Sequence, residues 1–511
     1  MFNGLTDKFF FTKRTDGTVR RSSFLDVMTS NEHQSIVSPF DHTEFFTTVL
    51  LINLAQGMFC PKSQKDLYDK FDNPLTKTAF QKGIKKYKSA FYLEDKKKPF
   101  FQFTGPIKKS LKIQNLFPEV PGDNAPSLYY DNNTIKKVCP ACVFVGLNTR
   151  IHYPFQGTGC SSGFVKGHAN FIIHNDNLRK KIWSNVVPKN VLKLHYSSTD
   201  NEPLWCNQDA WFMDWNSKVE KEDNPNQFGF LKGALLVGAK LRVEWKQEKC
   251  TCDICGEKTD VFSERFYKEP GRSMVDKVNY PNNLGYTQIV ESKKDGLLSI
   301  PLKTPVSKPI QFSKKLEFFH VIESYIIKTL CAGGEYTRSL PIMNGNHKTL
   351  AKGYEFAVVE VGGFCWDNSK LKGSYFESIP FGASLFDNED VVNLIRQYFE
   401  LLHNTIKKLN AAFAVTTLTG NRSNEMVHML CKLIIDKMFV MLKKSSINNK
   451  EESSEFLKWL YNSVKECYCE GAKSIESRNT KAYVEGLKRI VRGKYSVNSI
   501  IKQWKKERWG E

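Results

Sequence analysis

The pattern of hydrophobic and polar positions predicts a hairpin followed by helices in the first ninety residues. The apolar runs "KFFFTKR" (8–14) and "TVRRSSF" (18–24) flank "TDG", which is typical of two strands joined by a tight turn. Residues 42–90 place apolar side chains three to four positions apart, with "NPLT" (73–76) as a turn and helix cap. The apolar stretch 45–59 also contains Thr, Asn, Gln and Gly, so it predicts a buried helix rather than a membrane span.

The middle of the chain predicts loops and strands. Residues 105–137 are rich in turn formers and end in the polar loop "YYDNNTIKK", and residues 155–163 form a Gly/Ser loop. Residues 228–246 are strand-like or mixed, and short strands with turns are expected after Cys255, up to about residue 380.

From Asp387 onward the chain has no proline and predicts long amphipathic helices. Asp387 is expected to cap the first, and the third starts after Asn449. The second covers roughly 424–444 with its Met-rich face in the core, and that face runs through Met426, Leu430, Leu433, Ile434, Met438 and Met441. The fourth covers roughly 479–508 and has a possible break near Gly493. The fold class predicted is therefore α+β: a large mixed N-terminal globular domain (1–380), followed by an all-α C-terminal four-helix bundle (381–511).

Two cysteine pairs predict a metal site in the N-terminal domain. Cys139 and Cys142 form one C-x2-C pair, and Cys252 and Cys255 form the other, with Gly256 behind it. Such pairs are the usual halves of a four-thiolate structural zinc site. About 110 residues separate the pairs, so zinc would join two distant segments rather than build a small finger.

Other interpretations of these cysteines remain open at this point. Cys250 is an alternative to Cys252, and His168 or His174 is able to replace one thiolate. The "CPAC" pair also resembles a redox dithiol. A third alternative is a cysteine site that binds no metal.

The charge of the chain indicates a polyanionic partner. Its 511 residues carry a formal net charge of +20, which favours nucleic acid first and a membrane surface second. Residues 82–112 hold ten lysines interleaved with aromatic residues, which suits either a nucleic-acid backbone with base stacking or a solvated face over an aromatic core. The basic last 26 residues (486–511) fit either a strand path or an ordinary charged helix end.

Neither secretion nor catalysis has a clear signal. The N-terminus lacks the form of a signal peptide and no stretch reaches 18 apolar residues, so we expect a cytoplasmic protein without a membrane partner. No paired carboxylates, nucleophile elbow or His-Cys arrangement stands out, and the two histidines of "GHANFIIHNDN" (167–177) are too close for a ββα-metal nuclease. We therefore expect a protein that is not an enzyme. The alternatives are a His/Cys metal nuclease and a purely structural, zinc-stabilised subunit of an RNA–protein assembly.

The order of several short motifs resembles one family. The motifs are "NPLT" (73–76), "FYL" (91–93), the first cysteine pair followed by "LN" (147–148), a Gly loop leading to "NLR" (177–179), the second cysteine pair, and "IMNG" (342–345). Together with the length and the helical C-terminal quarter, they resemble CasA, the family of large subunits of the type I-E CRISPR surveillance complex Cascade.

The resemblance implies a non-catalytic DNA-recognition role. Such a subunit recognises the short flanking signal, the PAM, in target double-stranded DNA, while base pairing to the guide RNA reads the rest. It promotes duplex opening and R-loop formation, and it recruits the helicase–nuclease. The implied partners are the crRNA-containing Cascade subunits, target DNA and that helicase–nuclease, and the implied cofactor is structural zinc.

The resemblance also implies which residues contact the PAM. A first loop falls on Tyr129, Tyr130, Asp131 and Asn132; a glycine loop on Gly157, Thr158 and Gly159; a cationic finger on Lys268 or Arg272; and a wedge on Thr349, Leu350 and Ala351. Strict register places the finger at Pro270, so one of its cationic neighbours must substitute. The wedge has Leu350 where the family pattern has Gln, and an apolar wedge still separates base pairs but lacks the amide's hydrogen bonds.

Overall fold

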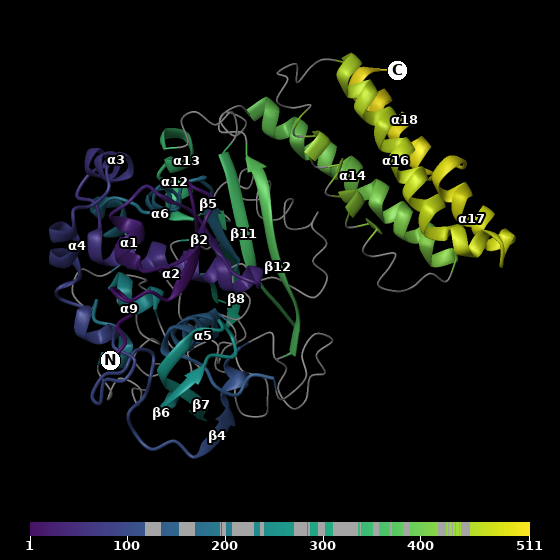
Figure 1. Cartoon of the computed structure of the whole chain (residues 1–511). Helices are drawn as coiled ribbons and strands as arrows, with labels where there is room; N and C mark the ends of the chain where they lie inside the picture. The colour runs from purple at the N-terminus through teal and green to yellow at the C-terminus, as the bar shows by residue number, and fades with distance from the viewer. Residues whose placement is uncertain are drawn as a thin grey trace. The chain divides into compact units, whose positions relative to one another are not determined.

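The computed structural model describes most of the chain in two compact units. The described residues are 1–117, 134–152, 169–194, 196, 201–206, 229–235, 240–269, 284, 287–294, 302–309, 336–337, 339–350, 357–367, 370–381, 389–416, most of 426–440, and 450–510. The first unit lies within Met1–Lys314 and Glu335–Ile379, and the described residues of the second lie within Pro380–Glu511 (Figure 1).

The predicted N-terminal hairpin is confirmed. Strands β1 (Phe10–Arg14) and β2 (Val19–Ser22) pair antiparallel, and β3 (His33–Val37) pairs with the other edge of β1. Gly17 in the turn has a φ of 81°, in the left-handed region that glycine enters without a steric cost. The hairpin leads into the short helix α1 (Phe24–Met28), which Ser23 caps.

The helices predicted for residues 42–90 are confirmed as well. They are α2 (Asp41–Phe59), α3 (Gln64–Asp72), α4 (Lys77–Ile84) and the 3-10 turn η1 (Lys88–Phe91). Most of α2 is buried, as its apolar composition predicts. The "NPLT" segment forms the predicted turn and cap: α3 ends before Asn73, and Thr76 Oγ1 accepts a hydrogen bond of 3.1 Å from Ala79 N at the start of α4.

Three further sheets belong largely to the first unit. The first has the order β4-β7-β6, and its strands β4 (Lys109–Lys112), β7 (Lys258–Glu269) and β6 (Lys240–Thr251) pair antiparallel. The turn between β6 and β7 contains the second cysteine pair. The second has the order β12-β11-β5, with β12 (Lys370–Phe381), β11 (Ala357–Asp367) and β5 (Asn170–Ile173). The third has the order β10-β8-β9, with β10 (Tyr336–Thr337), β8 (Thr287–Lys294) and β9 (Leu302–Pro309). At 12 residues, β7 is longer than the short strands predicted after Cys255.

Short helices connect these sheets. They are η2 (Ile113–Leu116), α5 (Pro140–His152), α6 (Leu178–Ser184), α7 (Lys189–Leu192), η3 (Leu204–Cys206), α9 (Phe230–Ala234), α12 (Leu340–Met343) and α13 (Asn346–Thr349). The mixed character predicted for 228–246 is confirmed, since α9 precedes β6 there. Aromatic side chains of α2 join the layers, with the rings of Phe46 and Phe364 stacked at 5.3 Å.

The C-terminal region is helical, as predicted. It contains α14 (Glu389–Val415), α16 (Lys450–Glu476), α17 (Thr480–Val491) and α18 (Val497–Trp509), with helical residues also in the described part of 426–440 (Figure 1). Helix α14 packs against α17 and α18, and α16 packs against α17. The capping residue expected at Asp387 lies outside the described residues.

Two details differ from the simplest helical pattern. The predicted fourth helix is two helices, because Gly493 with a φ of 112° interrupts it at the position where a break was considered. In the second helical stretch Leu430, Ile434 and Met438 are buried as expected, whereas Leu433 is 57% exposed. Leu433 lies one position before Ile434, about 100° around the helix, and so falls outside the core face.

Among the helices described, none is both long enough and apolar enough to cross a membrane.

Candidate metal centre

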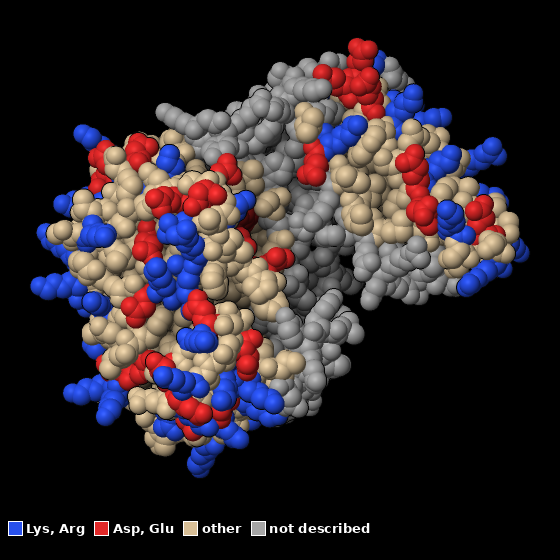
Figure 2. All heavy atoms as spheres, viewed as in Figure 1, with Lys and Arg blue, Asp and Glu red and all other residues tan. Residues whose placement is uncertain are grey.

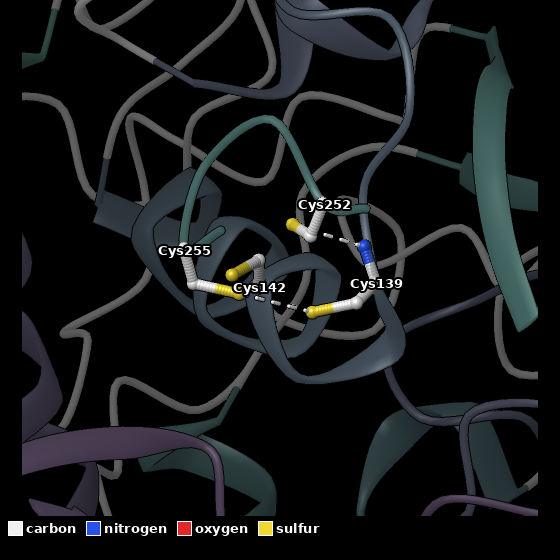
Figure 3. A group of neighbouring side chains, drawn as sticks. All are labelled: Cys139, Cys142, Cys252 and Cys255. Atoms are coloured by element: carbon white, nitrogen blue, oxygen red, sulfur yellow. Dashed lines mark hydrogen bonds between the residues drawn. The ribbon is translucent and has the colours of Figure 1, made fainter. Parts of the chain in front are cut away.

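The two cysteine pairs come together in the first unit. The Sγ atoms of Cys139, Cys142, Cys252 and Cys255 all lie within 4.8 Å of one another, and the four side chains gather in one place (Figure 3). Cys139 directly precedes α5 and Cys142 lies in its first turn, whereas the other two lie in the turn between β6 and β7. The predicted pairing of segments far apart in the sequence is confirmed.

The turn between β6 and β7 is shaped to present its two thiols. Gly256 has a φ of 73°, and its N–H donates to the carbonyl oxygen of Cys252 at 2.9 Å. Cys252 N in turn donates to Glu257 O at 2.9 Å. A glycine takes this left-handed conformation without strain, so the loop closes tightly enough to bring both sulfurs to one side.

The other pair is held against this hairpin by hydrogen bonds. Val138 and Ser263 exchange two backbone hydrogen bonds, of 3.0 and 2.9 Å. Asp253 Oδ2 accepts from the backbone N–H groups of Lys136 and Lys137 at 2.7 Å each. Cys139 N donates to Cys252 Sγ at 3.4 Å, a direct link between the two pairs. The protein scaffold itself thus positions the four sulfurs.

The geometry fits a tetrahedral metal ion with thiolate ligands. Zinc–sulfur bonds of about 2.3 Å imply sulfur–sulfur edges of about 3.8 Å. Cys139 Sγ and Cys255 Sγ are 3.7 Å apart. All four are free cysteines, and they are buried apart from the half-buried Cys255. The set therefore suits a closed structural site, in which no ligand position is left for a substrate.

The proton affinities of the four thiols are strongly unequal. Hydrogen bonds from Cys139 and Cys142 lower the pKa of Cys252 to about 6, and the same two partners also lower the pKa of Cys255. The hydrogen bond from Cys142 lowers the pKa of Cys139, but hydrogen bonds to Cys252 and Cys255 and burial outweigh it, so that pKa is raised. The pKa of Cys142 is raised by its hydrogen bonds to the other three cysteines and by burial. Crowded thiols resist full ionisation, so a divalent cation would supply the positive charge that four thiolates need.

Neither of the two described alternative ligands joins this group. Cys250 lies on β6 outside the four-sulfur cluster. His174 contacts Glu360 Oε1 through Nδ1 at 2.6 Å and Asp176 Oδ1 through Nε2 at 3.1 Å. The third, His168, lies outside the described residues.

Of the residues predicted to contact DNA, three are described. Those outside the described residues are Tyr129, Tyr130, Asp131, Asn132, Gly157, Thr158, Gly159, Arg272 and Ala351. Lys268 lies on β7 between Leu241 of β6 and Lys109 of β4, and only 3% of it is exposed. Leu350 is 5% exposed and packs in the main core, and Thr349 Oγ1 donates to Gly345 O at 3.3 Å.

The lysine-rich segment 82–112 covers an aromatic core. Phe91, Phe100 and Phe101 are fully buried, and the rings of Phe100 and Phe101 both pack on Trp205. They offer no ring face to a nucleic-acid base, so the second interpretation of this segment describes it better. On the face seen in Figure 2, cationic and anionic side chains are interspersed.

Lysines do gather around one cleft of the first unit. It has a volume of about 850 Å³ and is lined by Lys62, Lys70, Lys82, Lys189 and Lys193. Asp66 also lines it but forms an ion pair with Lys70. The cleft is therefore strongly cationic, which favours an anionic ligand.

Sequence reasoning missed the polar residues around the cysteines. Asp253 lies inside the C-x2-C loop, but the backbone N–H groups that it accepts from belong to Lys136 and Lys137, 117 and 116 positions away, so the local sequence did not show this contact. Arg21, whose Nη2 lies 3.9 Å from Cys142 Sγ, comes from the N-terminal hairpin. Nothing in the local sequence pattern connects that position to the cysteines, since 121 residues separate them.

The fold and the site define a class of protein: a mixed α/β unit in which a four-cysteine cluster joins two distant segments, followed in the chain by a helical unit. The profile of one protein family, CRISPR-associated protein Cse1, matches residues 3–477. The chain therefore belongs to the Cse1 family, also called CasA, and the resemblance found in the sequence is confirmed.

Solved structures share this fold over nearly the whole chain. CRISPR-associated protein Cse1 from Acidimicrobium ferrooxidans superposes with a TM-score of 0.67 at 13% identity, covering 99% of this chain and 98% of that one. CasA from Thermus thermophilus gives a TM-score of 0.66 at 12% identity, covering 99% of this chain and 100% of that one. A chain of a CRISPR RNA-guided surveillance complex gives 0.63 at 11% identity, covering 96% of this chain and 98% of that one. At these identities the likeness concerns the fold.

Proposed function

We propose that this protein is the non-catalytic large subunit of a type I-E CRISPR RNA-guided surveillance complex, acting in the cytoplasm. Membership of the Cse1 family over residues 3–477 carries the proposal. The similar fold of a chain in a CRISPR RNA-guided surveillance complex supports it, as does the net charge of +20, which suits an assembly built on nucleic acid. In this role the protein recognises the PAM in target double-stranded DNA, promotes R-loop formation and recruits the helicase–nuclease.

The proposed PAM contacts come from four short segments. Tyr129, Tyr130 and Asn132 form the first loop, and Gly157–Gly159 approaches the minor groove through backbone. The minor groove offers a degenerate code, so a few such contacts accept several PAM sequences. For the cationic finger we favour Arg272, because Lys268 is 3% exposed and would have to leave the β4-β7-β6 sheet to reach a phosphate.

Thr349–Ala351 is the proposed wedge. Opening the first base pairs costs roughly one or two stacking steps of about 1.4 kcal/mol each. A wedge is effective when a rigid scaffold holds it, and Leu350, buried in the main core, provides that attachment.

We further propose that the four cysteines hold structural zinc, and that the zinc clamps residues 129–137 against the segment that follows Cys255. The hydrogen bonds of Asp253 to Lys136 and Lys137 support this arrangement, because they connect the described end of that loop to the second cysteine pair. The metal would supply the folding energy of a closed site and no reactive centre. The lysine cleft is suited to hold phosphates of the bound nucleic acid.

A binding selection on the assembled complex tests the proposal. The chain is combined with its partner subunits and a guide RNA, then incubated with duplexes that carry one matching target and a randomised flank. Recovery of a restricted set of flanks is expected, and Arg272→Ala with Tyr130→Ala should weaken binding to that set. Equal recovery of all flanks, unaltered by these substitutions, would contradict PAM recognition. DNA cleavage by the complex without the helicase–nuclease would contradict the non-catalytic role.

A further inference from the structure

Arg21 of the N-terminal hairpin lies beside the four-cysteine cluster. Its Nη2 is 3.9 Å from Cys142 Sγ, within the range of an N–H···S hydrogen bond. Its Nη1 forms an ion pair with Glu257, which directly follows the second cysteine pair and Gly256. One guanidinium thus contacts Cys142 of the first pair and Glu257, two positions after the second pair, from a third segment of the chain.

The surroundings of Arg21 make its charge effective. Its side chain is 14% exposed, and the ring of Phe11 lies 5.1 Å from its Cζ. Arg21 also lines a cavity of about 230 Å³ together with Cys142, Cys255 and mainly apolar side chains. Charges interact more strongly in such a poorly solvated environment than at an open surface.

The guanidinium also has a spare donor. Arg21 Nε is buried and has no hydrogen-bond partner among the described residues. A buried N–H without an acceptor is costly. A negatively charged centre next to it would offset this cost electrostatically.

We propose that Arg21 is the charge partner of the metal–thiolate centre and couples the N-terminal hairpin to metal binding. This inference rests on the metal occupancy proposed above, and it does not depend on DNA recognition. A divalent ion with four thiolates leaves a net charge of −2, and arginine remains protonated at every relevant pH. Glu257 offsets part of this positive charge, because its carboxylate contacts Nη1, but its side chain is 45% exposed and water partly screens it. Nη2 remains directed at Cys142 Sγ.

The coupling works in both directions. If Arg21 strengthens metal binding, then by linkage the metal strengthens the attachment of the hairpin that carries Arg21. The β1–β2 hairpin should therefore be more firmly held in the metal-loaded protein than in the metal-free one.

Metal competition on the full-length chain tests this proposal. The affinity for Zn²⁺ is measured against a chromophoric chelator, and Co²⁺ loading is followed by the cobalt–thiolate absorption band. Arg21→Gln is expected to weaken metal binding about 10- to 100-fold, as for other residues that support metal ligands from outside the coordination sphere. Arg21→Lys, which keeps the charge, should recover most of the affinity.

Arg20→Gln is the matched control, because Arg20 is the exposed neighbour on the same strand. It should bind metal like the wild type. Equal affinities of Arg21→Gln and Arg20→Gln, an Arg21→Lys variant as weak as Arg21→Gln, or a wild-type chain without metal affinity would each overturn the proposal. A wild-type chain that binds metal normally but fails to select a PAM would contradict the proposed function and leave this inference standing.

Hydrogen exchange separates the proposed role from a general folding defect. In the wild type, metal loading should slow amide exchange in residues 10–22, and in Arg21→Gln this effect should be lost while exchange in helix α2 stays unchanged. Equal metal-induced protection of the hairpin in both proteins would show that Arg21 does not carry the coupling.

Discussion

Arg179 and Asn31 are 148 positions apart in the sequence, and Arg179 Nε donates a 2.8 Å hydrogen bond to Asn31 Oδ1. The same fully buried guanidinium donates to the carbonyl oxygens of residues 70–73, at the end of α3. Burial lowers the pKa of Arg179 to about 10, which still leaves it charged at neutral pH. One side chain therefore satisfies the free carbonyls of a helix end and joins it to the loop at Asn31.

Substituting Arg179 by Lys should destabilise the first unit by about 2–4 kcal/mol. Lysine keeps the charge, but its single ammonium cannot reach five acceptors arranged around a planar fork, and unpaired buried carbonyls remain. Urea unfolding followed by far-UV circular dichroism measures the change. Arg20→Lys at an exposed position serves as the control, and equal unfolding midpoints for the two variants would refute the role assigned to Arg179.

Removing the metal should lower the stability of the first unit. The purified chain is expected to contain close to one equivalent of zinc, and a Cys139→Ser/Cys255→Ser double variant should contain none. A ligand present at a thousand times its dissociation constant stabilises the folded state by about 4 kcal/mol, so a strong chelator should lower the melting temperature clearly.

Cys250→Ser provides the matched control for the metal, because Cys250 lies outside the four-sulfur cluster. This variant should keep its zinc and its melting temperature. If Cys250→Ser lost its zinc as completely as the Cys139→Ser/Cys255→Ser double variant, Cys250 would have to be a ligand, and the assignment of the four ligands would be wrong.

The stability that His174 contributes should decline as the pH rises. The hydrogen bond to Glu360 raises the pKa of His174 above its ordinary value of 6.5. Burial raises the pKa of Glu360, but the attraction of Lys181 and hydrogen bonds from His174 and Lys181 outweigh burial and lower this pKa to about 2. Glu360 therefore stays ionised throughout this pH range. A group with a raised pKa stabilises the folded state fully below its unfolded value, and this contribution is lost as the pH rises through the folded value.

His174→Gln should therefore be less stable than the wild type at pH below 6.5, with the difference shrinking at higher pH. Urea unfolding of both proteins across this range measures the difference. In a Glu360→Gln background the His174 substitution should have a much smaller pH-dependent effect, since only Asp176 remains as a carboxylate partner and its side chain is 73% exposed. A pH-independent difference between His174→Gln and the wild type would contradict the assignment.

Replacing Gly486 by Ala should destabilise the second unit, although alanine favours helix by about 1 kcal/mol. A Cβ at Gly486 would lie 2.1 Å from Tyr468 Oη and 2.8 Å from the backbone oxygen of Ala412. The tyrosine is fixed by its 2.8 Å hydrogen bond to Tyr483 O, so helices α14, α16 and α17 would have to separate. Overpacking of this kind costs about 1–3 kcal/mol.

Val484→Ala on the same helix α17 is the control for Gly486. Val484 is 41% exposed, so its substitution changes mainly the intrinsic helix preference and should be neutral or slightly stabilising. Thermal unfolding of both variants measures the contrast, and a Gly486→Ala protein as stable as the wild type would disprove the close approach.

Local patterns were sufficient for elements whose signals lie within a few residues. The turn at "TDG" and the cap at Thr76 depend on neighbours in the sequence, and both were predicted correctly. The helix break near Gly493 is also a local signal, because glycine enters a φ of 112° without a steric cost. The face of Leu433 was assigned less well, since its exposure depends on what the rest of the unit covers.

The sequence by itself determined the helical C-terminal region, the N-terminal hairpin and the identity of the four cysteines, because periodicity, turn chemistry and ligand spacing are local properties. Only the tertiary structure decided that Lys268 and Leu350 are buried, that the aromatic residues of 82–112 are core, and that Arg21 lies next to Cys142. Burial and long-range contacts arise when segments more than a hundred residues apart pack together. The free energy of that packing belongs to the whole chain, and no short stretch of sequence carries it.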